Sequence, residues 1–202
     1  MNRVASFPAL VFFCIATPAA VMGADELAAQ CNDCHGDGGV SSWDDVPTIA
    51  GLDAFSASDA LFSYRDKARP CVSSAWRQGD TSRPATDMCA ETAKLSDDDI
   101  DALAEHYAKL DFVPAKQDFD AALAEKGKSK HAASCERCHS EGGSNLEDEA
   151  SILAGQRMGY LKGAIAEYRS GEREQPDKMK EEMDKLSDDD VTALLHYYAS
   201  QQ

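Results

Sequence analysis

Two five-residue stretches share one pattern, a pair of cysteines two residues apart followed directly by histidine: Cys31-Asn32-Asp33-Cys34-His35 and Cys135-Glu136-Arg137-Cys138-His139. On a helix, residues i, i+3 and i+4 lie on one face, so both thiols and the imidazole point the same way. The pattern is typical of covalent c-type haem attachment, in which the thiols bond the vinyl groups and the imidazole reaches the iron. A redox-active cysteine pair and half of a zinc site are the alternatives. Two copies in one chain predict two covalently bound haems c.

The two stretches belong to an internal repeat. The halves align without gaps at an offset of 104 residues, from Cys31 opposite Cys135 as far as Arg65 opposite Arg169. Near the end of each half the offset is 91, which pairs two capped segments: Leu95-Ser96-Asp97-Asp98-Asp99 and Leu186-Ser187-Asp188-Asp189-Asp190. The first half therefore has 13 extra residues between positions 66 and 88. A tandem duplication with one elaborated loop accounts for this arrangement.

The predicted elements are all helical, and no strand pattern stands out. Each half has a helix ending at the cysteine motif, a middle helix and a last helix that starts after a serine: 25–35, 58–67 and from Ser96 in the first half, and 126–139, 160–170 and from Ser187 in the second. Both serines are followed three residues on by aspartate, which forms a capping box. The fold class is all-α, with domains at 25–110 and 121–202 joined by a linker at 111–120.

Residues 1–24 have the features of a signal peptide. Arg3 supplies a positive charge, residues 9–16 are largely apolar, and cleavage is expected near Gly23 or Ala24. The apolar run is shorter than the ~20 residues that a membrane-spanning helix needs. Lipid attachment at Cys14 is an alternative, but two bulky phenylalanines precede that cysteine. We therefore expect export to the periplasm with no membrane anchor.

The seven cysteines divide into three groups. Four belong to the two motifs, Cys14 leaves with the signal peptide, and Cys71 and Cys89 remain. In an oxidising compartment a disulfide between the remaining two is the default expectation. The alternative makes Cys89 a thiolate ligand of iron.

The formal net charge of −16 restricts the partners of the protein. It argues against nucleic acid and anionic membrane surfaces. It favours a protein partner with a basic patch. Acidic side chains that merely keep an exported protein soluble explain the charge equally well.

The axial ligands of the two irons decide the chemistry. His35 and His139 fill one position each. Met88 lies seven residues before Leu95, and Met179 lies seven residues before Leu186, so these two methionines occupy equivalent places in the repeat. We predict that they are the second axial ligands. The competing interpretations are a core-filling Met88 and ligation by Met183 in place of Met179.

Groups around the ligands are predicted less directly. The Pro47 carbonyl is placed to accept a hydrogen bond from the His35 ring, and Ser151 takes that place in the second half. The repeated tyrosines and arginines of the middle helices are candidates to face the haem propionates: Tyr64, Arg65, Tyr168 and Arg169. Three other histidines have no equivalent across the repeat and are expected to be ordinary surface or core residues: His106, His131 and His196.

With these motifs in view, the chain resembles the diheme cytochrome c4 family, over nearly all of its mature length. Within that group it is similar to the cytochrome subunit of flavocytochrome c sulfide dehydrogenase, in four stretches: residues 114–120, 135–143, 152–156 and 198–202. The resemblance implies two class I cytochrome c domains related by a pseudo-twofold axis. It implies covalent haem attachment at Cys31, Cys34, Cys135 and Cys138, and axial ligation by His35, Met88, His139 and Met179. The partner would be a sulfide-oxidising flavoprotein, although the lengthened loop from Cys71 to Cys89 departs from the pattern of that subunit.

Two six-coordinate haems leave no vacant site for a substrate, so we expect no catalytic residue and a role in electron transfer. The first hypothesis is a periplasmic subunit that accepts electrons from a sulfide-oxidising flavoprotein. The second is a free-standing carrier of the cytochrome c4 type that serves a terminal oxidase. The third is a diheme enzyme, such as a thiosulfate dehydrogenase or a peroxidase, which requires a thiolate or a displaceable ligand at one iron.

Overall fold

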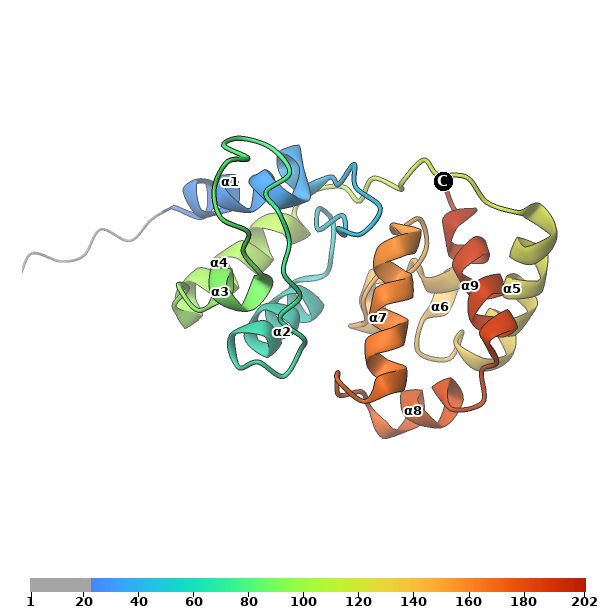
Figure 1. The fold of residues 1–202 in the computed structure, drawn as a ribbon. Coiled ribbons are helices and arrows are strands. Elements are labelled where there is room, and N and C mark those ends of the chain that lie inside the picture. Colours follow the sequence, from blue (N-terminus) through green and yellow to red (C-terminus); the bar gives the residue numbers. More distant parts are fainter. Residues whose placement is uncertain (1–22) are drawn as a thin grey trace, which may run out of the picture.

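The computed structural model describes residues 23–202, and these residues form two helical lobes joined by an extended segment (Figure 1). The all-α prediction is confirmed over this part of the chain, where the only strand-like pairing is an isolated bridge between Ser74 and Thr86. The predicted signal peptide lies outside the described residues, apart from its last two. None of the described helices is both long and apolar enough to cross a membrane.

The first lobe packs its haem-motif helix against its last helix. It comprises α1 (Ala24–His35), η1 (Asp37–Gly39), α2 (Ala54–Arg65), α3 (Met88–Thr92) and α4 (Asp97–Ala108). Leu27 and Ala28 of α1 and Leu103 and Tyr107 of α4 form its buried cluster. The Tyr107 hydroxyl donates a hydrogen bond to the Ala28 carbonyl at 3.2 Å, which fixes the two helices relative to each other.

The second lobe repeats this plan around a larger apolar cluster. It comprises α5 (Ala121–Ser134), α6 (Ser140–Gly143), η2 (Leu146–Asp148), α7 (Met158–Ser170), α8 (Asp177–Met183) and α9 (Asp188–Ala199). The cluster is built mainly from α7 and α9: Leu161, Leu186, Val191, Leu194, Leu195, Tyr197 and Tyr198. The apolar face of α9 is formed by Val191, Leu194, Leu195 and Tyr198, which recur at helical spacing in the sequence.

Both predicted capping boxes are present. At the start of α4 the Ser96 hydroxyl accepts from the Asp99 N–H, and the Asp99 carboxylate accepts from the Ser96 N–H. Ser187 and Asp190 do the same for α9. The Asp190 pKa falls to about 2, because the Ser187 N–H and hydroxyl and the Lys130 ammonium all stabilise the carboxylate.

The predicted helix from 126 to 139 is wrong at its C-terminal end, because α5 stops at Ser134. The cause is His131, which is 1 % exposed and occupies the position of Leu27 in the first half. Its Nε2 lies 3.0 Å from the His139 carbonyl oxygen, and its Nδ1 lies 2.9 Å from the Tyr198 hydroxyl. In a continuous helix the His139 carbonyl would point away from residue 131. The bond to the buried ring therefore requires the chain to turn back, and Leu27 makes no such bond in α1.

Gly127 lets α5 and α9 approach closely. A Cβ at this position would collide with the backbone carbonyl of Ala193. We expect Gly127→Ala to destabilise the second lobe by about 3 kcal/mol, the upper part of the range for overpacked sites. Thermal unfolding of the holoprotein measures this. Gly163→Ala is the matched control, because a Cβ there meets nothing within 4 Å, and a stable Gly127→Ala protein would contradict the prediction.

The two lobes contact each other through polar groups. The Gln156 side chain, 2 % exposed, exchanges two hydrogen bonds of 2.9 Å with the backbone of Thr48. Nearby, the Asp44 carbonyl accepts from the Tyr160 N–H at 2.8 Å, and the Asp44 carboxylate accepts from the Gly159 N–H at 2.9 Å. Because each of these groups is paired across the boundary, the relative position of the lobes is fixed by directional bonds.

Candidate haem-binding sites

The first cysteine motif lies on the last turn of α1. Cys31 and Cys34 are both free of disulfides, and His35 is 7 % exposed. The His35 Nδ1 lies 3.0 Å from the Pro47 carbonyl oxygen, as the sequence predicted, which leaves Nε2 without a protein partner. Burial lowers the pKa of His35 and so favours the neutral imidazole, which is the form that binds a metal. This histidine is therefore oriented before any ligand arrives, and its burial favours the uncharged ring.

The second motif has the same residues on a different backbone. Cys135 and Cys138 are free, but the motif forms a turn after α5, in which the N–H groups of Cys138 and His139 both donate to the Cys135 carbonyl. The pKa of His139 is lowered mainly by burial and further by the neighbouring His131 ring, while the Asp148 carboxylate and a backbone hydrogen bond at Ser151 oppose this shift. The shift again favours the neutral imidazole, although the ring is less buried than that of His35.

The two predicted thioether ligands begin or occupy short helices at equivalent places. Met88 is the first residue of α3, and Met179 lies within α8; both are half-buried. The competitor Met183 packs against the apolar cluster of the second lobe. Met183 therefore already has a packing role, whereas Met179 is not among the side chains that contact this cluster.

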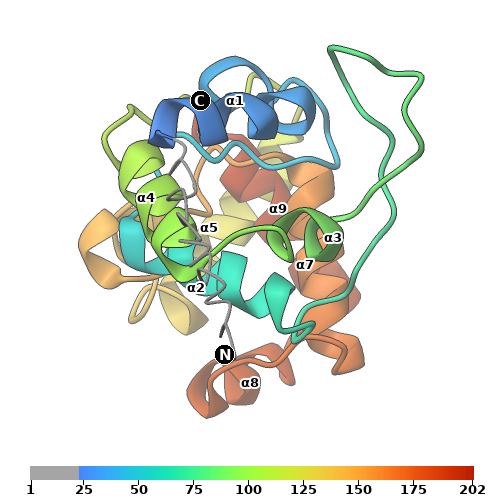
Figure 2. The same cartoon turned by 90° about the vertical axis from the view of Figure 1, so that its left-hand side faces the viewer.

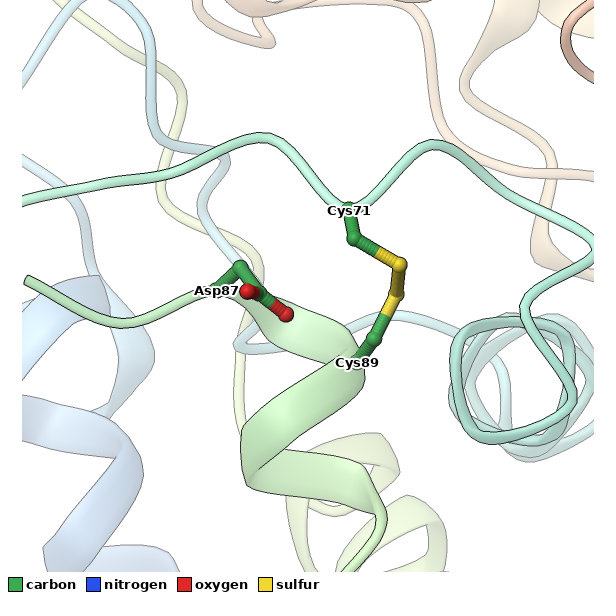
Figure 3. A group of neighbouring side chains, drawn as sticks. All are labelled: Cys71, Asp87 and Cys89. Atoms are coloured by element: carbon green, nitrogen blue, oxygen red, sulfur yellow. A yellow bond between two sulfur atoms is a disulfide. The ribbon is translucent and has the colours of Figure 1, made fainter.

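The structure joins Cys71 and Cys89 in a disulfide (Figure 3). The alternative in which Cys89 is a free thiolate ligand is therefore wrong. The disulfide lies beside Asp87, whose carboxylate caps α3 by accepting from the Ala90 N–H at 2.8 Å. Both features hold the start of α3, and hence Met88, in a defined place.

Two arginines near the lobe boundary, Arg69 and Arg173, were not among the functional residues predicted from the sequence. The guanidinium of Arg69 lies over the Tyr64 ring at 4.2 Å, and that of Arg173 lies over the Tyr168 ring at the same distance. Positions 69 and 173 are separated by the repeat offset of 104, so extending the ungapped alignment by four residues would have found them. The arginines considered instead are engaged elsewhere: Arg65 pairs with Asp97, and Arg169 pairs with Asp188.

The surroundings of Arg69 and Arg173 show whether this part of the chain suits the charge of a bound haem. Arg69 is 6 % exposed and its Nε has no hydrogen-bond partner, and within residues 23–202 neither Arg69 nor Arg173 forms an ion pair with a carboxylate. Both line a cavity of about 320 Å³ that has walls from the two lobes. Burial raises the pKa of Tyr160, but the charges of the two arginines more than offset this and lower it overall. Buried positive charge without a counterion fits the propionate groups that haem would bring.

Comparison with known proteins gives a consistent result. Residues 122–197 match the family model described as cytochrome c oxidase, cbb3-type, subunit III. The chain is 29 % identical over 190 residues to the thiosulfate dehydrogenase electron acceptor of Stutzerimonas stutzeri, covering 88 % of this chain and 82 % of that protein. It is 34 % identical over 70 residues to cytochrome c-554(548) of Halomonas halodenitrificans, which spans 34 % of this chain and 84 % of that protein.

Among solved structures, reduced cytochrome c4 from Pseudomonas stutzeri superimposes with a TM-score of 0.71 at 23 % identity, over 89 % of this chain and 97 % of that one. This likeness extends through both lobes and confirms the predicted architecture of two class I cytochrome c domains. The chain has the two-domain fold of cytochrome c4, and its two C-x-x-C-H motifs indicate two covalently bound haems c. With the match to cytochrome c-554(548), which extends over 84 % of that protein, these features assign the chain to the c-type cytochromes.

Proposed function

We propose that the protein is a periplasmic diheme electron carrier that accepts electrons from a thiosulfate dehydrogenase. The observation that carries this proposal is the similarity to the Stutzerimonas stutzeri protein, which is named for that role and aligns with most of both chains. The partner predicted from the sequence, a sulfide-oxidising flavoprotein, is a second candidate. It is supported by the four stretches of resemblance to a flavocytochrome subunit.

We further propose the ligand set predicted from the repeat. Cys31 and Cys34 would hold the first haem and Cys135 and Cys138 the second, with His35, Met88, His139 and Met179 as axial ligands. The bound haem supplies an iron that takes up and releases one electron at a time. The two histidines would provide imidazoles whose burial favours the neutral form, and the arginines over Tyr64 and Tyr168 would provide counter-charges for the propionates. With this ligand set neither iron would have a vacant position for a substrate, which favours electron transfer as the role of both haems.

The charge of the protein supports a carrier in preference to an enzyme acting on sulfur anions. Thiosulfate and hydrosulfide are negative at neutral pH, and a protein of net charge −16 repels them. The same field attracts a protein partner with a basic docking face and increases the rate of their encounter. Both candidate partners therefore have the same electrostatic requirement, so charge does not choose between them.

A reduction assay separates the candidates. We expect the oxidised holoprotein to be reduced within seconds by thiosulfate plus a catalytic amount of thiosulfate dehydrogenase, and not by thiosulfate alone. Sulfide plus a flavoprotein sulfide dehydrogenase forms the second arm, with sulfide alone as its blank. Faster reduction in the flavoprotein arm would favour the second candidate. Rapid reduction by thiosulfate alone would overturn the carrier proposal and indicate an enzyme.

A further inference from the structure

The first lobe has a segment that is 13 residues longer than its counterpart in the second. We call residues 71–89 the strap; the disulfide closes its two ends. Ser74 and Thr86 pair through two backbone hydrogen bonds of 2.7 and 3.0 Å, which bring its two arms together. Figure 2 shows the strap as the long green loop that projects at the upper right, beside α1 and above α3.

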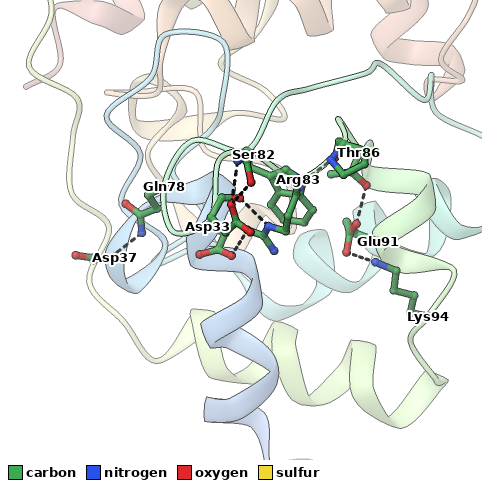
Figure 4. Close-up of polar contacts among 11 residues, drawn as sticks. Asp33, Asp37, Gln78, Ser82, Arg83, Thr86, Glu91 and Lys94 are labelled. Atoms are coloured by element: carbon green, nitrogen blue, oxygen red, sulfur yellow. Dashed lines mark hydrogen bonds and ion pairs between the residues drawn. The ribbon is translucent and has the colours of Figure 1, made fainter.

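The tip of the strap lies on the first haem motif. The N–H groups of Arg77 and Gln78 donate to the Asp33 carbonyl oxygen at 2.9 and 3.0 Å. The Arg83 guanidinium pairs with the Asp33 carboxylate, and the Gln78 amide donates to Asp37 at 2.8 Å (Figure 4). Asp33 lies between the two cysteines of the motif. The strap therefore contacts both the backbone and the side chain of a residue inside the haem-binding stretch.

The other end of the strap is fixed at α3. The disulfide holds Cys89, the residue that follows Met88. The Thr86 hydroxyl donates to the Glu91 carboxylate at 2.6 Å, and that carboxylate also pairs with Lys94 (Figure 4). Since one end is held beside Met88 and the tip is held on Asp33, the strap links the segment of one proposed axial ligand to the motif of the other.

The strap keeps its shape through contacts of its own. The Arg83 guanidinium lies 3.6 Å from the centre of the Trp76 ring, and the Trp76 Nε1–H donates to the Pro84 carbonyl at 2.8 Å. The Arg83 Nε also donates to the Asp80 carbonyl at 2.9 Å. The guanidinium that reaches Asp33 is therefore positioned by the strap itself, so less side-chain freedom is lost when the ion pair forms.

The second lobe differs from the first at the residues that hold the strap. Arg137 occupies the position of Asp33, and the segment that corresponds to the strap is 13 residues shorter there. An arginine at this position would repel Arg77 and Arg83 of a strap, so the acidic residue occurs in the half that has one. The cysteine that follows this position also differs in exposure between the lobes: Cys34 is half-buried and Cys138 is exposed.

We propose that the strap is a positioning device that holds Met88 at the first haem, with Asp33 as its anchor, and that the second haem lacks such a device. The inference rests on the proposed ligand role of Met88. Closing the chain between the two ligand segments reduces the freedom that a dissociated Met88 would gain, and so it disfavours loss of the thioether from the iron. The first haem should therefore resist ligand displacement more strongly than the second.

Imidazole titration of the ferric holoprotein tests this. Imidazole competes with the thioether, and loss of the far-red absorption band that marks a ferric iron–thioether bond reports its binding. We expect Asp33→Arg, which installs the residue of the second motif, to raise the imidazole affinity of one haem about tenfold, as loss of charge-assisted bonds implies. In a Met179→His background, which leaves the first haem as the source of the band, the same shift should appear.

Asp101→Arg is the matched control. It makes the same change of charge on α4 of the same lobe, at an exposed side chain that forms no hydrogen bond or ion pair with the described residues. The double variant Cys71→Ser/Cys89→Ser provides a second route to the same shift if Asp33→Arg fails to mature. Unchanged imidazole affinity in both, or an equal change at both haems, overturns the proposal. A wild-type protein without the band for two haems instead overturns the proposed ligand set.

Discussion

A Met88→His variant is expected to lose half of the far-red band and to lower the midpoint potential of one haem by a few hundred millivolts, part of the ~0.8 V that axial ligands span. The physical reason is that an imidazole donates more charge to ferric iron than a thioether does, and so stabilises the oxidised state. The measurement is a redox titration followed by absorption, in which the two haems separate into two steps.

Met179→His should remove the other half of the band and lower the other potential. Met183→Leu is the control, because Met183 packs against the apolar cluster of the second lobe. A Met183→Leu protein that loses half of the band while Met179→His keeps it would transfer the ligand role to Met183. A Met88→His protein with the complete band would exclude Met88 altogether.

Replacing both Cys135 and Cys138 by alanine is expected to reduce the covalently bound haem from two per chain to one. Haem that is not covalently attached is extracted by acidified organic solvent, so the mass of the extracted protein and its haem content give the result directly. We also expect the second lobe to unfold at a lower temperature, because its cluster of Leu161, Leu195 and Tyr198 would lose the porphyrin as a neighbour.

The mirrored double variant of Cys31 and Cys34 should remove the first haem and leave the second. Cys71→Ser/Cys89→Ser is the control that changes two cysteines and keeps both haems. Two covalent haems in the Cys135 and Cys138 variant, or bound zinc in the wild type, would revive the interpretation of this motif as a redox or metal site.

Local spacing explains what was predictable in the fold. The capping boxes at Ser96 and Ser187 need only residues three apart, and the structure has both. The bond from His35 to the Pro47 carbonyl was also predictable, since the two residues are only twelve positions apart. The predicted boundary of α2 was less accurate. This helix begins at Ala54, because Asp53 accepts from the Ser56 N–H at 2.8 Å and caps it.

Long-range contacts explain what was not predictable. The end of α5 depends on the buried ring of His131, which contacts the His139 carbonyl with one nitrogen and, with the other, the hydroxyl of Tyr198, 67 residues away. The unpaired charge of Arg69 becomes visible only when the second lobe closes over it. The strap was recognised as an insertion, but the sequence did not show that its tip would reach back 50 residues from Arg83 to Asp33.

By itself, the sequence determined the chemistry: two motifs, each with two thiols and an imidazole at a fixed spacing, select haem c, and their duplication in one chain repeats the same small domain. Only the tertiary structure decided how the two copies differ. A buried histidine unwinds the second motif, and a disulfide-closed strap is attached to the first. Spacing along the chain fixes which groups a site contains, whereas contacts between distant segments fix the backbone that carries them and the neighbours that restrain them.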